Sequence, residues 1–235
     1  LPQQTMEKYL DTVNRIVRLK PDHISAYSLI VEKGTPFYEK YKFDMVKQEA
    51  GMRTEFLPNE DELYEMEKAG QAQLFDAGYK QYEISNYAKN NMACRHNIGY
   101  WTRENYLGLG IGAASLLDNV RYTNTSDIDK YLSGCRNIHD MKEDVFRTNL
   151  HISADVIDRK AQMEEFMFLG LRMTEGISTE CFRQTFGLTV ELVYGPVLEQ
   201  QIADRLLRKE DGRIFLSERG LDVSNYVMAQ FLLDK

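Results

Sequence analysis

The chain has 235 residues, 43% of them hydrophobic and 28% charged, a composition typical of a globular protein with one or two buried cores. Its net charge is −7, so a nucleic-acid-binding surface would have to be local. No apolar run approaches the length of a membrane span, and no secretory signal is visible. Three widely separated cysteines argue against a disulfide framework and favour a reducing, cytoplasmic location.

The first 31 residues predict a helix that leads into a strand. Thr5 is a candidate N-cap, apolar residues recur at helical spacing as far as Val17, and Pro21 ends the helix. Residues 23–31 are mostly apolar, which is typical of a buried strand. A helix followed by such a strand is half of the repeat of a parallel α/β barrel.

The polar segment 39–57 is compatible with either a short helix or a loop. Asn59 and Glu62 then predict a capping box for a helix that ends near Ala77, before Gly78. Residues 82–86 predict a short strand. Glu83 in this strand could orient a ligand, but we expect a partly exposed structural carboxylate.

Residues 94–115 (CRHNIGYWTRENYLGLGIGAAS) combine the only tryptophan with a cysteine, a histidine and three alternating glycines. His96 could supply an imidazole to the metal of a flat aromatic ligand, with Tyr100 or Trp101 stacking on it. The alternative is a hydrogen-bonded structural histidine among core aromatics. Cys94 and His96 share one face only if this segment is extended, and they make at most half of a zinc site.

Gly108, Gly110 and Gly112 do not form the GxGxxG dinucleotide fingerprint, because the last glycine comes one residue early. Close packing of the backbone against a cofactor or a neighbouring strand explains these glycines better. Residues 113–123 predict a hairpin that turns at Asp118 and Asn119. A short helix is expected from Ser126 to about residue 132.

The pattern weakens over residues 134–160, and we place a domain boundary there, dividing the chain into 1–140 and 141–235. His139 and His151 are expected at the surface. Helices are predicted at 163–173, 179–186 and 192–207, a strand at 212–217 and a last helix from 219. This order is similar to a winged-helix fold, but residues 160–235 carry nine Lys and Arg against twelve Asp and Glu. We therefore expect protein packing and no nucleic-acid binding.

Several segments resemble, in order and spacing, the oxygen-independent coproporphyrinogen III oxidase-like family of radical S-adenosylmethionine (SAM) proteins, most of all its haem-chaperone branch. In that branch HNxxYW is the haem-binding motif. The resemblance spans most of residues 1–125 and is weaker beyond. The matching segments are LPQQT at 1–5, HISAYSL at 23–29, GTPFY at 34–38, YEISNYA at 82–88, HNIGYW at 96–101 and YLGLGIGA at 106–113.

The resemblance implies an α/β fold, α+β overall: the C-terminal part of a radical SAM partial (β/α)6 barrel over 1–140, then a helical, winged-helix-like domain over 141–235. It implies haem, with His96 on the iron and Cys94 as a candidate second ligand. It places SAM near Tyr27 and Ser28. The other residues assigned to the cofactors are Asn97, Tyr100, Trp101, Gly108, Gly110 and Gly112.

One departure from the family is decisive for this chain. The family signature CxxxCxxC holds a [4Fe–4S] cluster, but Cys94, Cys135 and Cys181 stand about forty residues apart. The chain also starts without methionine, on what resembles the middle of the family's GLPxQT turn. We therefore expect a C-terminal portion of a longer protein, which by itself does no radical chemistry.

Three functions compete. The first is a SAM- and [4Fe–4S]-dependent haem chaperone that passes haem to an acceptor protein, with a homodimer and membrane association through the acceptor as open options. The second is oxidative decarboxylation of coproporphyrinogen III in porphyrin biosynthesis, where Arg95, Arg103 and Arg121 could pair with propionates. The third is a winged-helix adaptor without a small ligand. HNxxYW favours the first.

Overall fold

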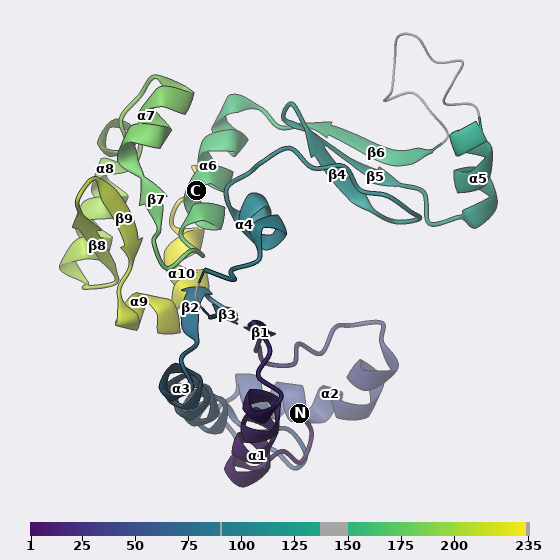
Figure 1. Cartoon of the computed structure of the whole chain (residues 1–235), viewed down its shortest axis with the longest axis vertical. Helices are drawn as coiled ribbons and strands as arrows, with labels where there is room; N and C mark the ends of the chain where they lie inside the picture. The colour runs from purple at the N-terminus through teal and green to yellow at the C-terminus, as the bar shows by residue number, and fades with distance from the viewer. Residues whose placement is uncertain (90, 137–149, 234–235) are drawn as a thin grey trace. The chain divides into compact units, whose positions relative to one another are not determined.

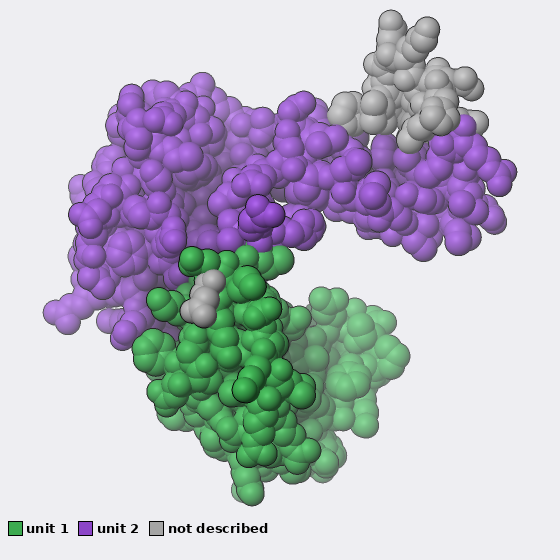
Figure 2. Space-filling view, in the orientation of Figure 1, with its two compact units in different colours: residues 1–94 green, residues 95–235 purple. Residues whose placement is uncertain are grey.

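A computed structural model describes residues 1–89, 91–136 and 150–233 of the protein (Figure 1). The chain forms two compact units, Leu1–Cys94 and Arg95–Lys235, which Figure 2 shows in different colours. This division differs from the expected boundary at residue 140, which itself lies outside the described residues and stays a prediction. None of the helices in the described ranges combines the length and apolar character needed to cross a bilayer.

Three helices build the first unit: α1 (Met6–Arg18), α2 (Pro36–Glu49) and α3 (Glu60–Asp76). The predicted caps are confirmed, since Thr5 accepts a hydrogen bond from the Lys8 backbone and Asn59 forms the capping box with Glu62. The open question at 39–57 is resolved as a helix over most of its length. Its start is fixed by the Thr35 side chain as N-cap and by a proline in the first turn.

The sheet of the first unit has the order β1-β3-β2, with β1 at His23–Ser25, β2 at Lys80–Glu83 and β3 at Asn86–Ala88. Both pairings are antiparallel, so these three strands do not show the parallel pairing expected of a barrel. The strand predicted over 23–31 is wrong beyond Ser25, because β3 offers only three residues to pair with. The strand predicted over 82–86 is correct for its ends, which belong to β2 and β3, and wrong at residues 84–85, where the chain turns between them.

Glu83 closes this turn and is fully buried, which corrects the expected partial exposure. Its carboxylate accepts hydrogen bonds from the Ser85 backbone N–H (2.7 Å) and the Asn86 side-chain amide. A buried carboxylate needs such donors to replace water. The role of Glu83 in this fold is therefore structural.

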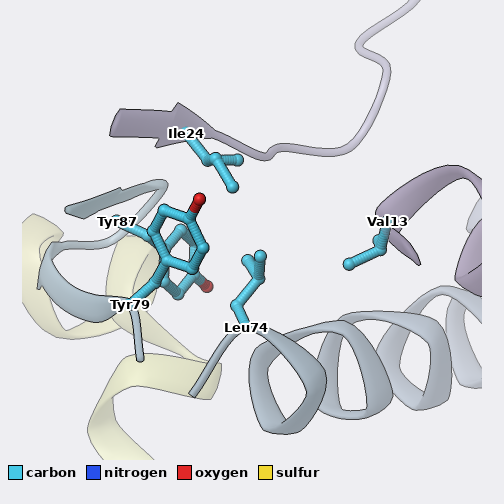
Figure 3. Packing of buried hydrophobic residues seen from close by; sticks show 5 residues of the cluster. All are labelled: Val13, Ile24, Leu74, Tyr79 and Tyr87. Carbon is cyan, nitrogen blue, oxygen red and sulfur yellow. The ribbon is translucent and has the colours of Figure 1, made fainter. Parts of the chain in front are cut away.

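The core of the first unit lies where α1 and α3 meet the sheet (Figure 3). Leu74 and Tyr79 are almost completely buried, and the Tyr79 hydroxyl donates to the Pro21 carbonyl at 2.6 Å. Burial raises the pKa of Tyr87 to about 12, so this phenol stays neutral and packs as a core residue. The cluster comprises Val13, Ile24, Leu74, Tyr79 and Tyr87.

Asp44 on α2 holds the segment that follows this helix. Its carboxylate accepts hydrogen bonds from the backbone N–H groups of Glu55 (3.0 Å), Phe56 (2.5 Å) and Leu57 (2.9 Å). Burial alone would raise the pKa of Asp44, but these donors and nearby Lys47 outweigh it, so the pKa lies below its ordinary value.

We expect Asp44→Asn to lower the free energy of unfolding by about 2 kcal/mol at pH 7, because the neutral amide replaces a charged acceptor. A depressed carboxyl pKa stabilises the fold above the unfolded pKa of about 3.9 and loses that effect as the pH falls through the folded value. Urea unfolding at several pH values should therefore show the difference shrinking in acid. Asp11→Asn, in an exposed pair with Arg15, is the control; a pH-independent difference would contradict this account.

The second unit begins with α4 (Arg95–Trp101) and an antiparallel sheet of β4 (Ala114–Leu117), β5 (Val120–Asn124) and β6 (His151–Val156), in that order, with α5 at Ile128–Arg136. The predicted hairpin is confirmed. Asp118 and Asn119 both have positive φ (48° and 63°), as a two-residue hairpin turn requires.

The strand β6 was not predicted, although its residues alternate between polar and apolar side chains from His151 to Val156. The residues after His151 are all exposed, so this alternation does not mark a buried face. His151 itself is half-buried with its ring against Tyr122 (centroids 4.4 Å apart), which corrects the expected surface position. His139 lies outside the described residues.

The rest of the unit runs in the order α6-β7-α7-α8-β8-β9-α9-α10, with a small sheet ordered β7-β9-β8. The predicted helices and the strand at 213–216 are present, but β7 and β8 were missed. The predicted third helix ends at Ala203 because the chain enters β8 at Leu207. The elements are α6 (Arg159–Gly170), β7 (Ile177–Ser178), α7 (Thr179–Phe186), α8 (Val190–Ala203), β8 (Leu207–Glu210), β9 (Arg213–Leu216), α9 (Glu218–Asp222) and α10 (Ser224–Ala229).

Candidate functional site

The HNxxYW motif lies entirely on the short helix α4. Residues four apart lie one above the other on a helix. The motif therefore makes two neighbouring rows, one of His96 and Tyr100 and the other of Asn97 and Trp101. Cys94 precedes the helix, so the extended geometry that would align it with His96 is absent.

The first row faces solvent. His96 is exposed and makes no hydrogen bond to any described residue, which argues against a structural histidine. Its ring meets Tyr100 edge to face, with centroids 4.7 Å apart, and Tyr100 meets Tyr106 in the same way at 4.6 Å. The three rings form what we call the aromatic ladder: His96, Tyr100 and Tyr106.

The second row is half-buried. The Arg172 guanidinium lies over the Trp101 ring, 4.3 Å from its centroid, and Arg172 lies two residues after the end of α6. The Trp101 Nε1 atom is buried without a hydrogen-bond partner among the described residues. Trp101 therefore fastens α4 to the C-terminal part of the unit, whereas His96 and Tyr100 remain accessible.

Of the three alternating glycines, Gly108 packs closely against the neighbouring strand, whereas an added Cβ on Gly110 or Gly112 would meet no heavy atom within 4 Å. A Cβ on Gly108 would lie 2.1 Å from the Ala114 carbonyl oxygen, so only glycine allows this approach to β4. The Gly108 N–H donates to the Ser115 hydroxyl (2.8 Å), and the Gly110 N–H donates to the Tyr131 hydroxyl (2.9 Å). Of the two explanations open for these glycines, a neighbouring strand fits Gly108. The amides of Gly108 and Gly110 are already bonded within the fold.

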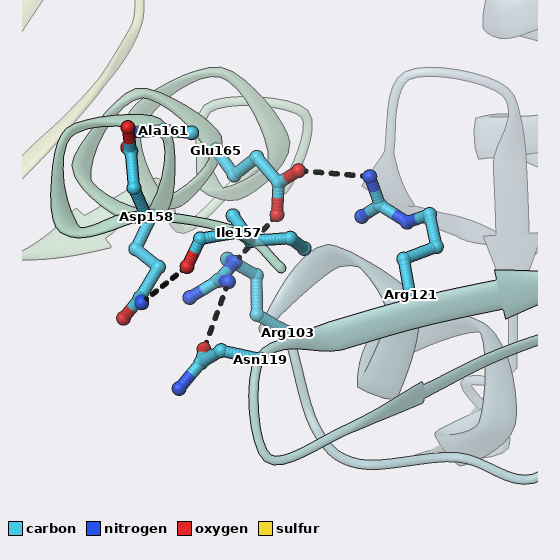
Figure 4. Close-up of polar contacts among 8 residues, drawn as sticks. Arg103, Asn119, Arg121, Ile157, Asp158, Ala161 and Glu165 are labelled. Atoms are coloured by element: carbon cyan, nitrogen blue, oxygen red, sulfur yellow. Dashed lines mark hydrogen bonds and ion pairs between the residues drawn. The ribbon is translucent and has the colours of Figure 1, made fainter. Parts of the chain in front are cut away.

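Behind α4, Glu165 on α6 stands between two arginines (Figure 4). Its carboxylate accepts from Arg103 Nε and from Arg121 Nη1, each at 2.9 Å. Burial alone would lower the pKa of Arg121, but Glu165 and the Tyr106 hydroxyl outweigh it and raise this pKa. Two of the three arginines considered for tetrapyrrole carboxylates are thus already paired.

Other expected ligands are not assembled. Within residues 1–89, 91–136 and 150–233, no three His, Cys, Asp or Glu side chains converge on a metal position. Cys94, Cys135 and Cys181 are free thiols. These residues do not fit a [4Fe–4S] cluster, in agreement with the missing CxxxCxxC. Tyr27 and Ser28 lie exposed in the first unit, on irregular chain after β1.

A hollow of about 410 Å³ lies among the turns at the C-terminal end of α8, where Arg205, Arg219 and Tyr226 line it. His96 does not line it. The aromatic ladder is instead a surface feature, and its chemistry rests on an accessible imidazole with flat aromatic neighbours. Sequence reasoning missed Tyr106, Arg172 and Glu165; only Tyr106 stood within a segment that carried the family resemblance.

Comparisons with known proteins concern the family and the fold of the chain. Residues 157–223 match the model of the HemN C-terminal domain. The heme chaperone HemW of Lactococcus lactis is 33% identical over 234 residues, covering 100% of this chain, and that of Bacillus subtilis is 30% identical over 232 residues, covering 99%. Each alignment covers 56% of the relative, so the chain spans about half the length of these curated relatives.

Among solved structures, the coproporphyrinogen III oxidase HemN from Escherichia coli, a radical SAM enzyme, matches 99% of this chain and 53% of its own with a TM-score of 0.70. At 15% identity this match concerns the fold, which is of the HemN type. The chain belongs to the oxygen-independent coproporphyrinogen III oxidase-like family, in the region that it shares with the HemW haem chaperones.

Proposed function

We propose that this chain is the haem-binding portion of a haem chaperone that delivers haem to acceptor proteins. The observation that carries the proposal is the accessible His96 ring, which makes no hydrogen bond to the described residues and stands at the head of the aromatic ladder. A neutral imidazole is a common axial ligand of haem iron. The HemW relatives, whose alignments extend over nearly all of this chain, support the same function.

The geometry suits a carrier better than a permanent haem protein. His96 offers the iron one ligand from a helix surface, and Tyr100 offers an aromatic edge beside the porphyrin plane. The opposite face of the haem is left to another ligand, which an acceptor protein can supply before His96 leaves. Haem is then cargo, held by one protein–iron bond and a modest apolar contact. Cys94, exposed just before α4, is a candidate for the second ligand.

The finer family features complete the proposal. The α6-β7-α7-α8-β8-β9 order supports a winged-helix-like domain near 141–235, which begins close to the matched residues 157–223. A partial (β/α)6 barrel, SAM near Tyr27 and Ser28, and a [4Fe–4S] cluster belong to the parent protein, since the cluster ligands are absent from this sequence. Homodimer formation and membrane association through the acceptor are part of the same proposal.

Decarboxylation of coproporphyrinogen is less well supported. That reaction requires basic groups for several propionates, but Arg103 and Arg121 are engaged by Glu165. Arg95 is the remaining arginine of the three considered.

Haem loading followed by transfer tests the proposal. The chain is titrated with haem, freed of excess, and mixed with an apo haem protein whose holo form has a distinct Soret band. We expect about one haem per chain, because the motif occurs once, and its passage to the acceptor. A folded chain that binds no haem, or a loaded chain that never releases it, would overturn the carrier function.

A further inference from the structure

A buried charged contact of the second unit joins α6 to the segment that follows α4, the helix of the candidate haem ligand. Glu165 is buried on α6, and the side chain of its partner Arg103 is 8% exposed. Figure 4 shows the carboxylate between the two guanidinium groups, with Arg103 also donating to the Asn119 side chain (3.2 Å). Charged groups so far from water persist only when they are paired, so this arrangement tolerates little movement.

One arm of this network fixes the backbone of α4. Arg103 lies two residues after the helix ends and has positive φ (58°), which a non-glycine residue adopts at a cost. The following loop is fastened again, because Asn105 and Asp118 exchange two hydrogen bonds of 3.0 Å. The end of α4 is thus tied to α6 and to the hairpin turn.

The other arm reaches the aromatic ladder. Arg121 on β5 binds the second oxygen of Glu165, and its guanidinium interacts electrostatically with the Tyr106 hydroxyl. Tyr106 contacts Tyr100, and Tyr100 contacts His96. A series of side-chain interactions therefore connects Glu165 with the His96 ring, although the two residues are far apart in the sequence.

We propose that Glu165 is a positioning residue for His96. Through Arg103 it fixes the end of α4, and through Arg121 and Tyr106 it supports the aromatic ladder, which orients the imidazole. The role rests on the proposed haem function. It makes the C-terminal domain part of the haem site, because Glu165 lies within the region matched by the HemN C-terminal domain model. Groups that hydrogen-bond directly to a metal ligand commonly change metal affinity 10- to 100-fold when they are replaced, and a support that acts through intervening side chains should have an effect near the lower end of that range.

Glu165→Gln tests this role, since it keeps the side-chain volume and removes the charge. We expect loss of haem to an apo acceptor to become about tenfold faster, with a shifted Soret band, and amide hydrogen exchange in α4 to become faster even without haem. Glu180→Gln, which breaks an exposed pair with Arg183 on α7, is the matched control and should change neither. Tyr106→Phe keeps the ring, cuts only the Arg121 arm, and should give a smaller effect of the same kind in a well-folded protein.

The outcomes separate the two proposals. If amide hydrogen exchange in α4 is unchanged in Glu165→Gln, the positioning role is overturned, whether or not the rate of haem loss changes. Faster exchange with unaltered haem release would also overturn it, provided that His96→Ala weakens haem binding in parallel. If His96→Ala has no effect on haem, the proposed function itself fails. Effects in Glu180→Gln as large as those in Glu165→Gln would show a general loss of stability and overturn the specific link.

Discussion

Replacing His96 with alanine should weaken haem binding by about 100-fold or more and abolish the Soret shift that accompanies iron–imidazole ligation. The reason is that His96 would supply the one protein–iron bond from α4. The fold should be little affected, because the side chain is exposed and its main contact is an edge-to-face meeting with Tyr100. Haem titration followed by absorbance, with circular dichroism to confirm folding, measures both quantities.

His23→Ala is the matched histidine control. The His23 ring shares a 2.9 Å hydrogen bond with the Tyr82 hydroxyl in the first unit, and it should not compete for iron. Cys94→Ala tests the second-ligand hypothesis separately, and a spectral change without large loss of affinity would identify the thiol as the opposite ligand. Equal haem binding by the parent chain and by His96→Ala would remove His96 from the site.

The second large effect is expected at Gly108. A methyl group there would meet the backbone carbonyl of Ala114, which no rotamer change can relieve. We expect Gly108→Ala to reduce the free energy of unfolding by about 3 kcal/mol. Thermal and urea unfolding measure this loss, and haem affinity per folded molecule should remain close to that of the parent if the glycine serves packing.

Gly110→Ala is the informative comparison. No heavy atom lies within 4 Å of its added Cβ, but its φ of +103° is unfavourable for alanine. A loss of about 1 kcal/mol is therefore expected from backbone conformation alone. Loss of haem binding by folded Gly110→Ala would instead favour direct backbone contact with the cofactor.

The sequence predicted well those features that depend on neighbouring residues. The capping box of α3, the N-cap of α1 and the turn at Asp118 and Asn119 are each set by side chains within a few positions. Family resemblance added the haem motif, which no periodicity would have revealed. The role of His96 as a haem ligand stays a prediction.

The errors arose where the outcome depended on distant partners. The apolar run after His23 leaves the sheet at Ser25 because its distant partner β3 is short. Glu165 gave no local signal: its importance comes from Arg103 and Arg121, 62 and 44 positions earlier in the chain. Ion pairs between remote segments leave no pattern in one sequence. The contacts of Glu165 with Arg103 and Arg121 could therefore be found only in the three-dimensional structure.

The placement of HNxxYW on α4 also limits how the motif can change during evolution. Each residue added to or removed from a helix turns everything beyond it by about 100°. Deleting one of the two spacer residues, Ile98 or Gly99, would rotate the residues that follow about the helix axis. Tyr100 would then lose its contact with His96, and Trp101 would lose its contact with Arg172. Substitution at Ile98 changes neither row. The two-residue gap is therefore a mechanical requirement of helical pitch, and drift in this family should alter the spacer's identity far more readily than its length.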